Sequence, residues 1–177
     1  MRKLALAGLS ACAWSLGLTA APSDAREQAA AARAADEPGL VGMWRIVRFE
    51  DVSADGTVAY PFGERPLGYF VYDATGHLSV QVMRNPPVRP FASGADDKPT
   101  DAEARAAYLG YAAYFGTYRV DKTNHVLHHV VEGALEPGYV GTDQPRPYRL
   151  NGDTLIIEVN DPATGARAYR ELRRLGR

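Results

Sequence analysis

Polar and aromatic side chains suited to binding or proton transfer are concentrated in the segment Tyr111–Leu150. Two strand-like runs, Tyr114–Val120 and Val126–Glu132, flank a polar turn at residues 121–124, and a third run spans Gln144–Leu150. Alternate side chains of a strand point to the same face of a sheet. Because tyrosines, histidines, a glutamine and arginines recur at such positions, the pattern predicts a polar and aromatic wall that faces a cavity.

The candidate ligand-binding residues come from these three runs and from the preceding run Leu67–Tyr72. They are Tyr72, Tyr114, Tyr118, His129, Gln144 and Arg146. A buried guanidinium without a partner is costly, so an inward Arg146 would pair with a carboxylate or another anion of the protein or of a ligand. The alternative is an outward Arg146 that lies in solvent beside Arg149.

The adjacent histidines His128 and His129 are the candidates for acid–base catalysis, because imidazole titrates near neutral pH. Neighbouring residues of a strand point to opposite faces, so the two histidines cannot bind one metal ion. His125 shares a face with His129 but lies about 13 Å away at ~3.3 Å per residue. No metal site and no cofactor are predicted, and the alternative role for His129 is a core histidine hydrogen-bonded to a neighbouring strand.

The chain has 177 residues, of which 46% are hydrophobic and 23% charged, as is usual for one globular domain. Its net charge of −1 and the absence of a basic stripe argue against a nucleic-acid partner. Arg2 and Lys3 precede the apolar run Leu4–Leu18, which is too short to span a bilayer comfortably. These features predict a signal peptide at residues 1–25 and an exported protein, periplasmic or secreted.

Cys12, the only cysteine, follows Leu9-Ser10-Ala11, a sequence similar to the site at which bacterial lipoproteins receive a lipid anchor. The apolar run continues beyond Cys12, which favours a soluble signal peptide over lipidation. A single cysteine leaves the mature chain without a disulfide. The alanine-rich residues 26–38 are predicted to form a flexible linker, and residues 39–177 the folded domain.

About nine short runs of alternating apolar residues, bounded by turn signals, are expected as strands between Leu40 and Leu175. A capping box at Thr100-Asp101-Ala102-Glu103 predicts one short helix that ends near Gly110. Such a helix usually covers an opening of a barrel or packs on its wall. Turn-length connections favour an all-β, antiparallel up-and-down barrel of about eight to ten strands, since closure removes exposed edges.

Several short segments carry a family resemblance; they include Gly42-Met43-Trp44, Gly76–Gln81, Tyr111–Val120, His128-His129, Val140–Gln144 and Arg146. Through them the domain resembles the bacterial and fungal lipocalin-like domain proteins. The resemblance implies a calycin-type barrel with a central cavity and no settled activity. It also implies that Trp44 closes the barrel base and that a late arginine packs on it, for which the candidates are Arg170, Arg173 and Arg174.

One segment departs from the family pattern, in which the paired histidines lead into Val-Glu-Gly. Here Val130 and Val131 both precede Glu132. An extra residue either reverses the facing of the side chains beyond it or forms a bulge. The sequence therefore leaves open which of His128 and His129 faces the cavity.

The leading functional prediction is an exported protein that binds a small hydrophobic or amphipathic molecule in the barrel cavity. Apolar burial would supply most of the affinity, and Arg146, Gln144 and the tyrosines would orient a polar end. The alternative is a cofactor-independent enzyme, such as an isomerase, cyclase or hydratase, with His128 or His129 as acid–base. A third class is a stress or assembly protein that acts through its surface.

Overall fold

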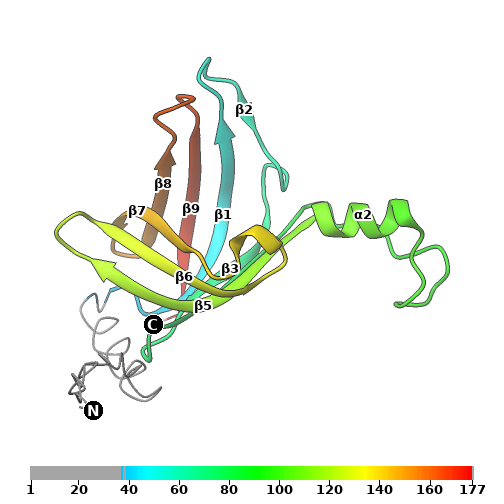
Figure 1. The fold of residues 1–177 in the computed structure, drawn as a ribbon, viewed down its shortest axis with the longest axis horizontal. Coiled ribbons are helices and arrows are strands. Elements are labelled where there is room, and N and C mark those ends of the chain that lie inside the picture. Colours follow the sequence, from blue (N-terminus) through cyan, green and yellow to red (C-terminus); the bar gives the residue numbers. More distant parts are fainter. Residues whose placement is uncertain (1–36, 38, 177) are drawn as a thin grey trace, which may run out of the picture.

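The computed structural model describes residue 37 and residues 39–176. The predicted signal peptide, Cys12 and all of the predicted linker except Glu37 lie outside the described residues. The described chain forms nine strands and one α-helix, and eight of the strands close into an antiparallel barrel (Figure 1). The all-β fold class predicted from the sequence is confirmed.

The strands are β1 (Gly42–Val52), β2 (Val58–Ala59), β3 (Leu67–Tyr72), β4 (His77–Met83), β5 (Tyr111–Asp121), β6 (Val126–Ala134), β7 (Asp143–Asn151), β8 (Thr154–Asn160) and β9 (Arg167–Leu175). The barrel order is β1-β3-β4-β5-β6-β7-β8-β9, and pairing of β9 with β1 closes it. The short β2 pairs only with the far end of β1. Each barrel strand therefore lies beside its neighbours in the chain, as an up-and-down topology requires.

The alternation of apolar residues sets which side chains fill the barrel. In β4, Leu78, Val80 and Val82 are buried, while the residues between them are at least partly exposed. At one end the interior is solid, because five side chains from different segments have almost no exposed surface: Leu40, Trp44, Leu127, Leu155 and Leu172. This apolar cluster is called the barrel base below. It contains Trp44, as the family resemblance implied.

A tryptophan and an arginine are packed together at the barrel base. Trp44 Nε1 donates to Leu40 O at 2.8 Å, and the Arg174 guanidinium carbon lies 4.2 Å from the Trp44 ring centroid. Arg174 also donates to Val41 O at 2.9 Å. Gly42 has φ 142°, and a Cβ at this position would lie 2.7 Å from the Arg174 guanidinium. Of the three late arginines considered from the sequence, Arg174 is the one that packs on Trp44.

A β-bulge follows the paired histidines. Phe115 pairs with Gly133 and Gly116 pairs with Val131, so Glu132 has no partner on β5. The extra residue after the histidines thus produces a bulge, one of the two outcomes that the sequence left open. A Cβ on Gly116 would lie 2.1 Å from the Val130 carbonyl oxygen, so the tight approach of β5 and β6 here requires glycine.

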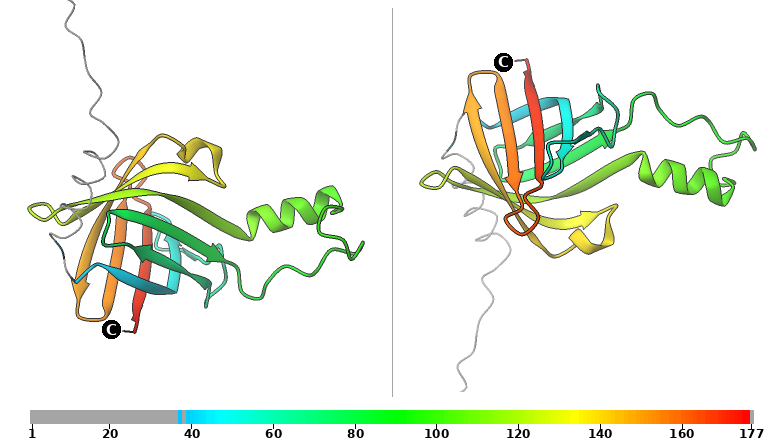
Figure 2. Two further views of the ribbon diagram at one scale, coloured as in Figure 1. Left: turned by 90° about the horizontal axis from the view of Figure 1, so that it is seen from below. Right: turned by 90° about the horizontal axis from the view of Figure 1, so that it is seen from above.

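The helix α2 (Asp101–Leu109) begins at the predicted capping box. The Thr100 hydroxyl accepts from Glu103 N at 3.3 Å, and the Glu103 carboxylate accepts from Thr100 N at 2.8 Å. Its predicted placement is wrong, because α2 projects away from the barrel and has no buried residue (Figure 2). Its apolar residues are mostly alanines, which offer little surface to bury. No described helix has the length and apolar character needed to cross a membrane.

Candidate ligand-binding site

A cavity of ≈ 520 Å³ occupies the barrel at the end away from Trp44. Volumes of roughly 300–1,000 Å³ are usual for sites that hold small molecules. Its apolar wall is built from six side chains on four strands: Phe49, Phe70, Val80, Val82, Ile157 and Val159. These side chains continue the inward faces of strands that form the barrel base, so one alternation pattern produces both regions.

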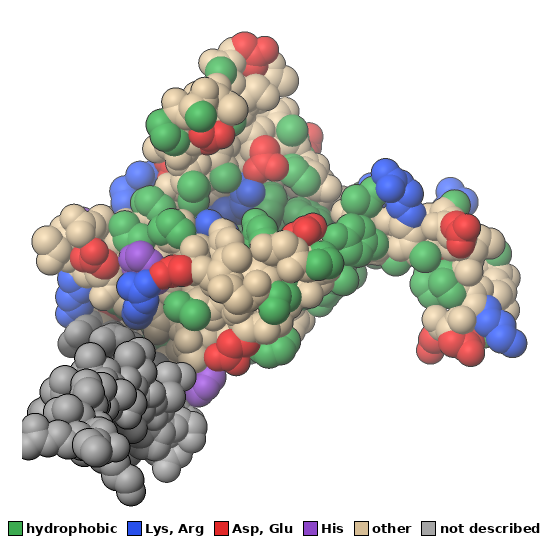
Figure 3. All heavy atoms as spheres, viewed as in Figure 1, with side chains coloured by type: hydrophobic (Ala, Val, Ile, Leu, Met, Phe, Trp, Pro, Cys, Tyr) green, Lys and Arg blue, Asp and Glu red, His purple; other side chains and the backbone are tan. Residues whose placement is uncertain are grey.

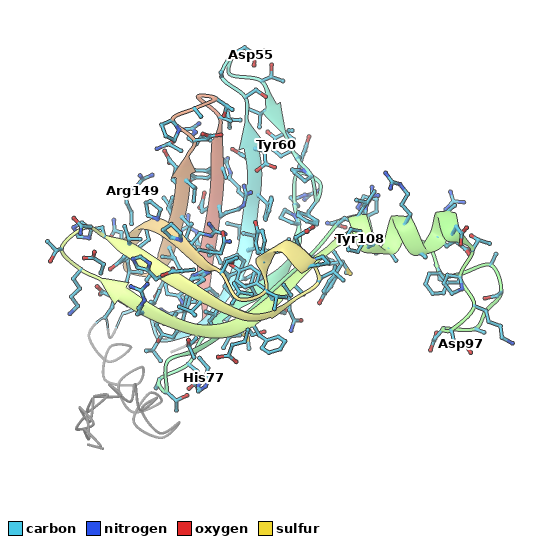
Figure 4. The ribbon with its side chains drawn as sticks, viewed as in Figure 1. Asp55, Tyr60, His77, Asp97, Tyr108 and Arg149 are labelled. Atoms are coloured by element: carbon cyan, nitrogen blue, oxygen red, sulfur yellow. The ribbon has the colours of Figure 1, made fainter. Side chains whose placement is uncertain are left out.

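The mouth of this cavity lies where α2 joins β5. Tyr108 and Leu109 from the last turn of α2 line it, and hydrophobic side chains gather on the surface at this junction (Figure 3). Tyr108 lies at the junction itself (Figure 4) and donates to the Glu136 carboxylate at 3.0 Å. The remainder of α2 extends beyond the mouth, so only its end takes part in the site.

Arg146 of β7 reaches the cavity wall and is held by a directed chain of hydrogen bonds. Its guanidinium donates to Gln144 Oε1 at 3.1 Å, and the Gln144 amide donates to the Thr142 hydroxyl at 2.8 Å. That hydroxyl donates in turn to the Tyr139 carbonyl oxygen at 2.6 Å. Because a guanidinium can only donate, this chain of hydrogen bonds fixes the Gln144 amide with its oxygen toward Arg146.

Arg170 of β9 is the second arginine that lines the cavity, and sequence reasoning assigned it only as a candidate for the base. Its guanidinium donates to Asp51 at 2.7 Å and lies 3.3 Å from the Phe49 ring centroid. Burial lowers the pKa of Arg170, Asp51 raises it, and the positive charge of Arg146 lowers it again. The two arginines are therefore close enough to repel each other across the cavity.

A buried cluster of Tyr72, His129 and Tyr114 forms the wall behind Arg146. The Tyr72 hydroxyl lies 3.0 Å from His129 Nε2, and the Tyr114 hydroxyl lies 2.8 Å from His129 Nδ1. His129 and Tyr72 are 0% and 1% exposed, whereas Tyr114 lines the cavity. Within the described part of the chain, His129 is thus connected to the cavity through Tyr114.

Burial sets the protonation of this cluster. Together with smaller effects of the charges of Arg146 and His128, it lowers the pKa of His129 to about 3. Burial also raises the pKa of Tyr114 to about 12, against a smaller opposing effect of Arg146. At neutral pH the cluster therefore consists of a neutral imidazole between two protonated phenols.

The other predicted site residues lie outside the cavity. His128 faces the barrel exterior, where its Nδ1 lies 2.9 Å from the Asp143 carboxylate, to which Arg119 also donates. The Tyr118 hydroxyl donates to Asp73 O at 2.8 Å. Gln144 orients Arg146 without lining the cavity. Of the six candidate ligand-binding residues, Tyr114 and Arg146 line the cavity. Gln144 contacts Arg146, and His129 contacts Tyr114. Tyr72 is connected to Tyr114 through His129.

Sequence reasoning missed Arg170, Phe49, Tyr139 and Glu136, all of which line the cavity. Arg170 and Leu172 alternate on β9, and this spacing could have assigned Arg170 to the inward face. Tyr139 lies in the short 3₁₀ turn Pro137–Tyr139, which has no periodic signal in the sequence. Among the described residues, no three His, Cys, Asp or Glu side chains lie close enough together to hold a metal ion.

Comparison with known proteins bears on the whole barrel. Residues 41–172 match the sequence model of a family described as a lipocalin-like domain. A solved structure of a redesigned β-barrel is similar with a TM-score of 0.40 and 12% identity, over 81% of this chain and 96% of that one. A search of curated proteins found no match.

Proposed function

Because the chain belongs to the lipocalin-like domain family, we propose that it binds a small amphipathic molecule in the barrel cavity. The observation that carries this proposal is that apolar and polar side chains line the same ≈ 520 Å³ cavity. Phe70, Val80 and Ile157 are among the apolar ones. Tyr114 and Arg146 form a polar side, and the other lining arginine, Arg170, is paired with Asp51.

Burial of the apolar part of the ligand would supply most of the affinity. Removal of apolar surface from water contributes about 25 cal/mol per Å² before the cost of association is subtracted. The polar side would contribute orientation, because Arg146 is already held by Gln144 and Tyr114 by His129. A preformed polar side lowers the entropy cost of ordering these side chains when the ligand binds.

The geometry supports binding better than acid–base catalysis by a histidine. A catalytic base must come within hydrogen-bond reach of the substrate, directly or through one water. Both ring nitrogens of His129 contact tyrosine hydroxyls, and Tyr114 stands between the imidazole and the cavity. His128 lies on the barrel exterior beside Asp143.

Titration with the neutral fluorescent probe N-phenyl-1-naphthylamine tests the proposal. We expect saturable binding to the wild-type protein and at least about tenfold weaker binding to Ala112→Phe and Ala168→Phe, since both alanines line the cavity. Ala59→Phe on the exposed β2 is the matched control and should bind normally. Circular dichroism establishes that each variant is folded. Equal binding by all four folded proteins would place the probe outside the cavity and contradict the proposal.

We also propose that the protein is exported, as Arg2, Lys3 and the apolar run Leu4–Leu18 suggest. Expression of the full chain in a Gram-negative host, followed by fractionation and intact mass measurement, tests this. A periplasmic product that has lost about 25 residues is expected. A full-length cytoplasmic product contradicts export, and a product that begins at a lipidated Cys12 supports the lipid anchor instead.

A further inference from the structure

We propose that the ligand carries a carboxylate or a closely related oxyanion, bound between the Arg146 guanidinium and the Tyr114 hydroxyl. We further infer that His129 is a positioning residue that makes Tyr114 a hydrogen-bond donor toward the cavity. Both statements rest on the proposed function, because they define the polar end of the molecule that the cavity binds.

Among the described residues, the charges around the cavity leave Arg146 without a counter-ion. Arg170 is paired with Asp51 at 2.7 Å, whereas none of the ion pairs among the described residues includes Arg146. Its acceptors there are neutral: the Gln144 amide oxygen, the Pro145 carbonyl and the Tyr114 hydroxyl. A partly buried guanidinium with neutral acceptors and a cationic neighbour is stabilised when an anion enters.

The acidic residue that lines the cavity does not neutralise Arg146. Glu136 is exposed at the mouth, where its carboxylate accepts from the Tyr108 hydroxyl at 3.0 Å and from Gly138 N at 3.4 Å. The carboxylate therefore belongs to the junction between α2 and β6. The wall formed by Arg146 and Tyr114 keeps its excess of positive charge.

The hydrogen bonds of His129 assign the direction of the Tyr114 hydroxyl. A neutral imidazole has one N–H donor and one acceptor nitrogen. Tyr72 is 1% exposed, and among the described residues its hydroxyl has no acceptor other than His129 Nε2. If Nε2 carried the proton, the Tyr72 hydroxyl hydrogen would be buried without an acceptor, which is costly. Nε2 therefore accepts from Tyr72, and the proton lies on Nδ1.

The position of the proton on His129 determines how the Tyr114 hydroxyl bonds. With its proton on Nδ1, His129 donates to the Tyr114 oxygen at 2.8 Å, and the Tyr114 hydroxyl hydrogen is free to point elsewhere. Since Tyr114 lines the cavity, this hydrogen is available to a ligand. Tyr114 and Arg146 then both present donors, which suits an ionised carboxylate because it is an acceptor only.

Three probes test the chemical class of the ligand: decanoate, 1-decanol and decylamine. They have alkyl chains of the same length and differ in the polar end group. Each competes against N-phenyl-1-naphthylamine at pH 7.5. We expect decanoate to bind at least about tenfold more tightly than 1-decanol, and decylamine to bind most weakly, because hydrogen bonds to charged groups are worth roughly 1.5–3 kcal/mol. Arg146→Gln should weaken decanoate binding about 10- to 100-fold and leave 1-decanol nearly unchanged. Tyr114→Phe should act in the same direction with a smaller effect.

Arg149→Gln is the matched control, because Arg149 lies on the same strand, points outward and pairs with Glu158. It should leave the affinity for decanoate unchanged. Tight binding of 1-decanol equal to that of decanoate would overturn the carboxylate proposal and leave cavity binding intact. Failure of all three probes and of the fluorescent probe would overturn the proposed function as well.

A separate readout tests the positioning role of His129. His129→Phe removes both hydrogen bonds, so the ratio of decanoate to 1-decanol affinity should fall toward that of Tyr114→Phe. His129→Gln, which can still donate to Tyr114 and accept from Tyr72, should restore the ratio. A merely structural role predicts that both affinities fall together and the ratio stays constant, and that result would overturn the assignment. If His129→Phe does not fold, a wild-type ratio in Tyr114→Phe overturns it equally, because His129 acts only through Tyr114.

Discussion

The barrel base and the cavity both contain an inward arginine from a late strand, yet the two arginines are used differently. At the base, Arg174 packs on Trp44, donates to Val41 O and forms an ion pair with Asp153. In the cavity, the acceptors of Arg146 among the described residues are all neutral, and its guanidinium borders open volume. Arg174 therefore makes its contacts within the fold, whereas Arg146 is a cation that can still bind a ligand.

The difference arises from the chain that precedes β1. Leu40 is fully buried at the base and supplies the acceptor for Trp44, and Glu37 accepts from the Tyr148 hydroxyl at 3.1 Å. This segment fills the base and provides carbonyl oxygens for Arg174. At the opposite end, the loop after β4 and α2 extends outward, so nothing in the described chain fills the cavity in the same way (Figure 2).

The largest expected effect separates a fully packed aromatic residue from one that borders the cavity. Trp44→Ala should lower the free energy of unfolding by about 3–5 kcal/mol, because it opens a void in a close-packed base. Phe49→Ala should lower it by only about 1–2 kcal/mol, since one side of Phe49 already faces the cavity. Urea denaturation followed by circular dichroism measures both. Equal losses would show that the two ends of the barrel are equally well packed.

The two arginines are expected to contribute differently to the free energy of unfolding. Arg174→Met should lower the free energy of unfolding by about 2–3 kcal/mol, because charge-assisted bonds to backbone carbonyls and the contact with Trp44 are lost. Arg146→Met should change it by less than about 1 kcal/mol, since the loss of its hydrogen bonds is offset by relief of the repulsion with Arg170. The same denaturation experiment measures both values. A larger loss for Arg146→Met would assign Arg146 to the fold instead of the ligand.

The sequence predicted the elements well because their signals are local. Period-two alternation located the strands, and the capping box at Thr100 located the start of α2. The placement of α2 failed because docking depends on an apolar stripe of sufficient area, which a run of alanines does not supply. The bulge at Glu132 was one of two outcomes that the extra valine allowed, and only the pairing with Phe115 and Gly116 decided between them.

The candidate site was predicted only in part. Alternation shows whether a side chain points into the barrel, but not its height, that is, its position along the barrel axis. Arg146 and Tyr118 both face inward, yet Arg146 lines the cavity and Tyr118 bonds to the turn at Asp73. Height depends on the register between strands, which is a non-local property. The environment of His129 likewise depends on Tyr72, which is 57 residues away in the chain.

We expect the loss of folding stability at low pH to arise at the cavity wall and not at the barrel base. The pKa of His129 is lowered to about 3 in the folded protein, against 6.5 for an exposed imidazole. Below about pH 6.5 the unfolded chain therefore binds a proton that the native state excludes. The stability is fully present above that pH and declines as the pH falls toward 3. At pH 5 the loss should be about 2 kcal/mol relative to neutral pH.

His129→Gln removes this proton uptake, so its unfolding free energy should depend less steeply on pH between 4 and 6.5 than that of the wild-type protein. His128→Gln is the matched control, because it makes the same change one residue away on the exterior face. It should not flatten the profile, because it leaves the buried imidazole of His129 in place, and His77 and His125 are present in all three proteins. Urea denaturation at several pH values measures the slopes. If His129→Gln and His128→Gln flatten the profile equally, His129 is not held neutral by burial, and the assignment of a neutral imidazole behind Tyr114 fails.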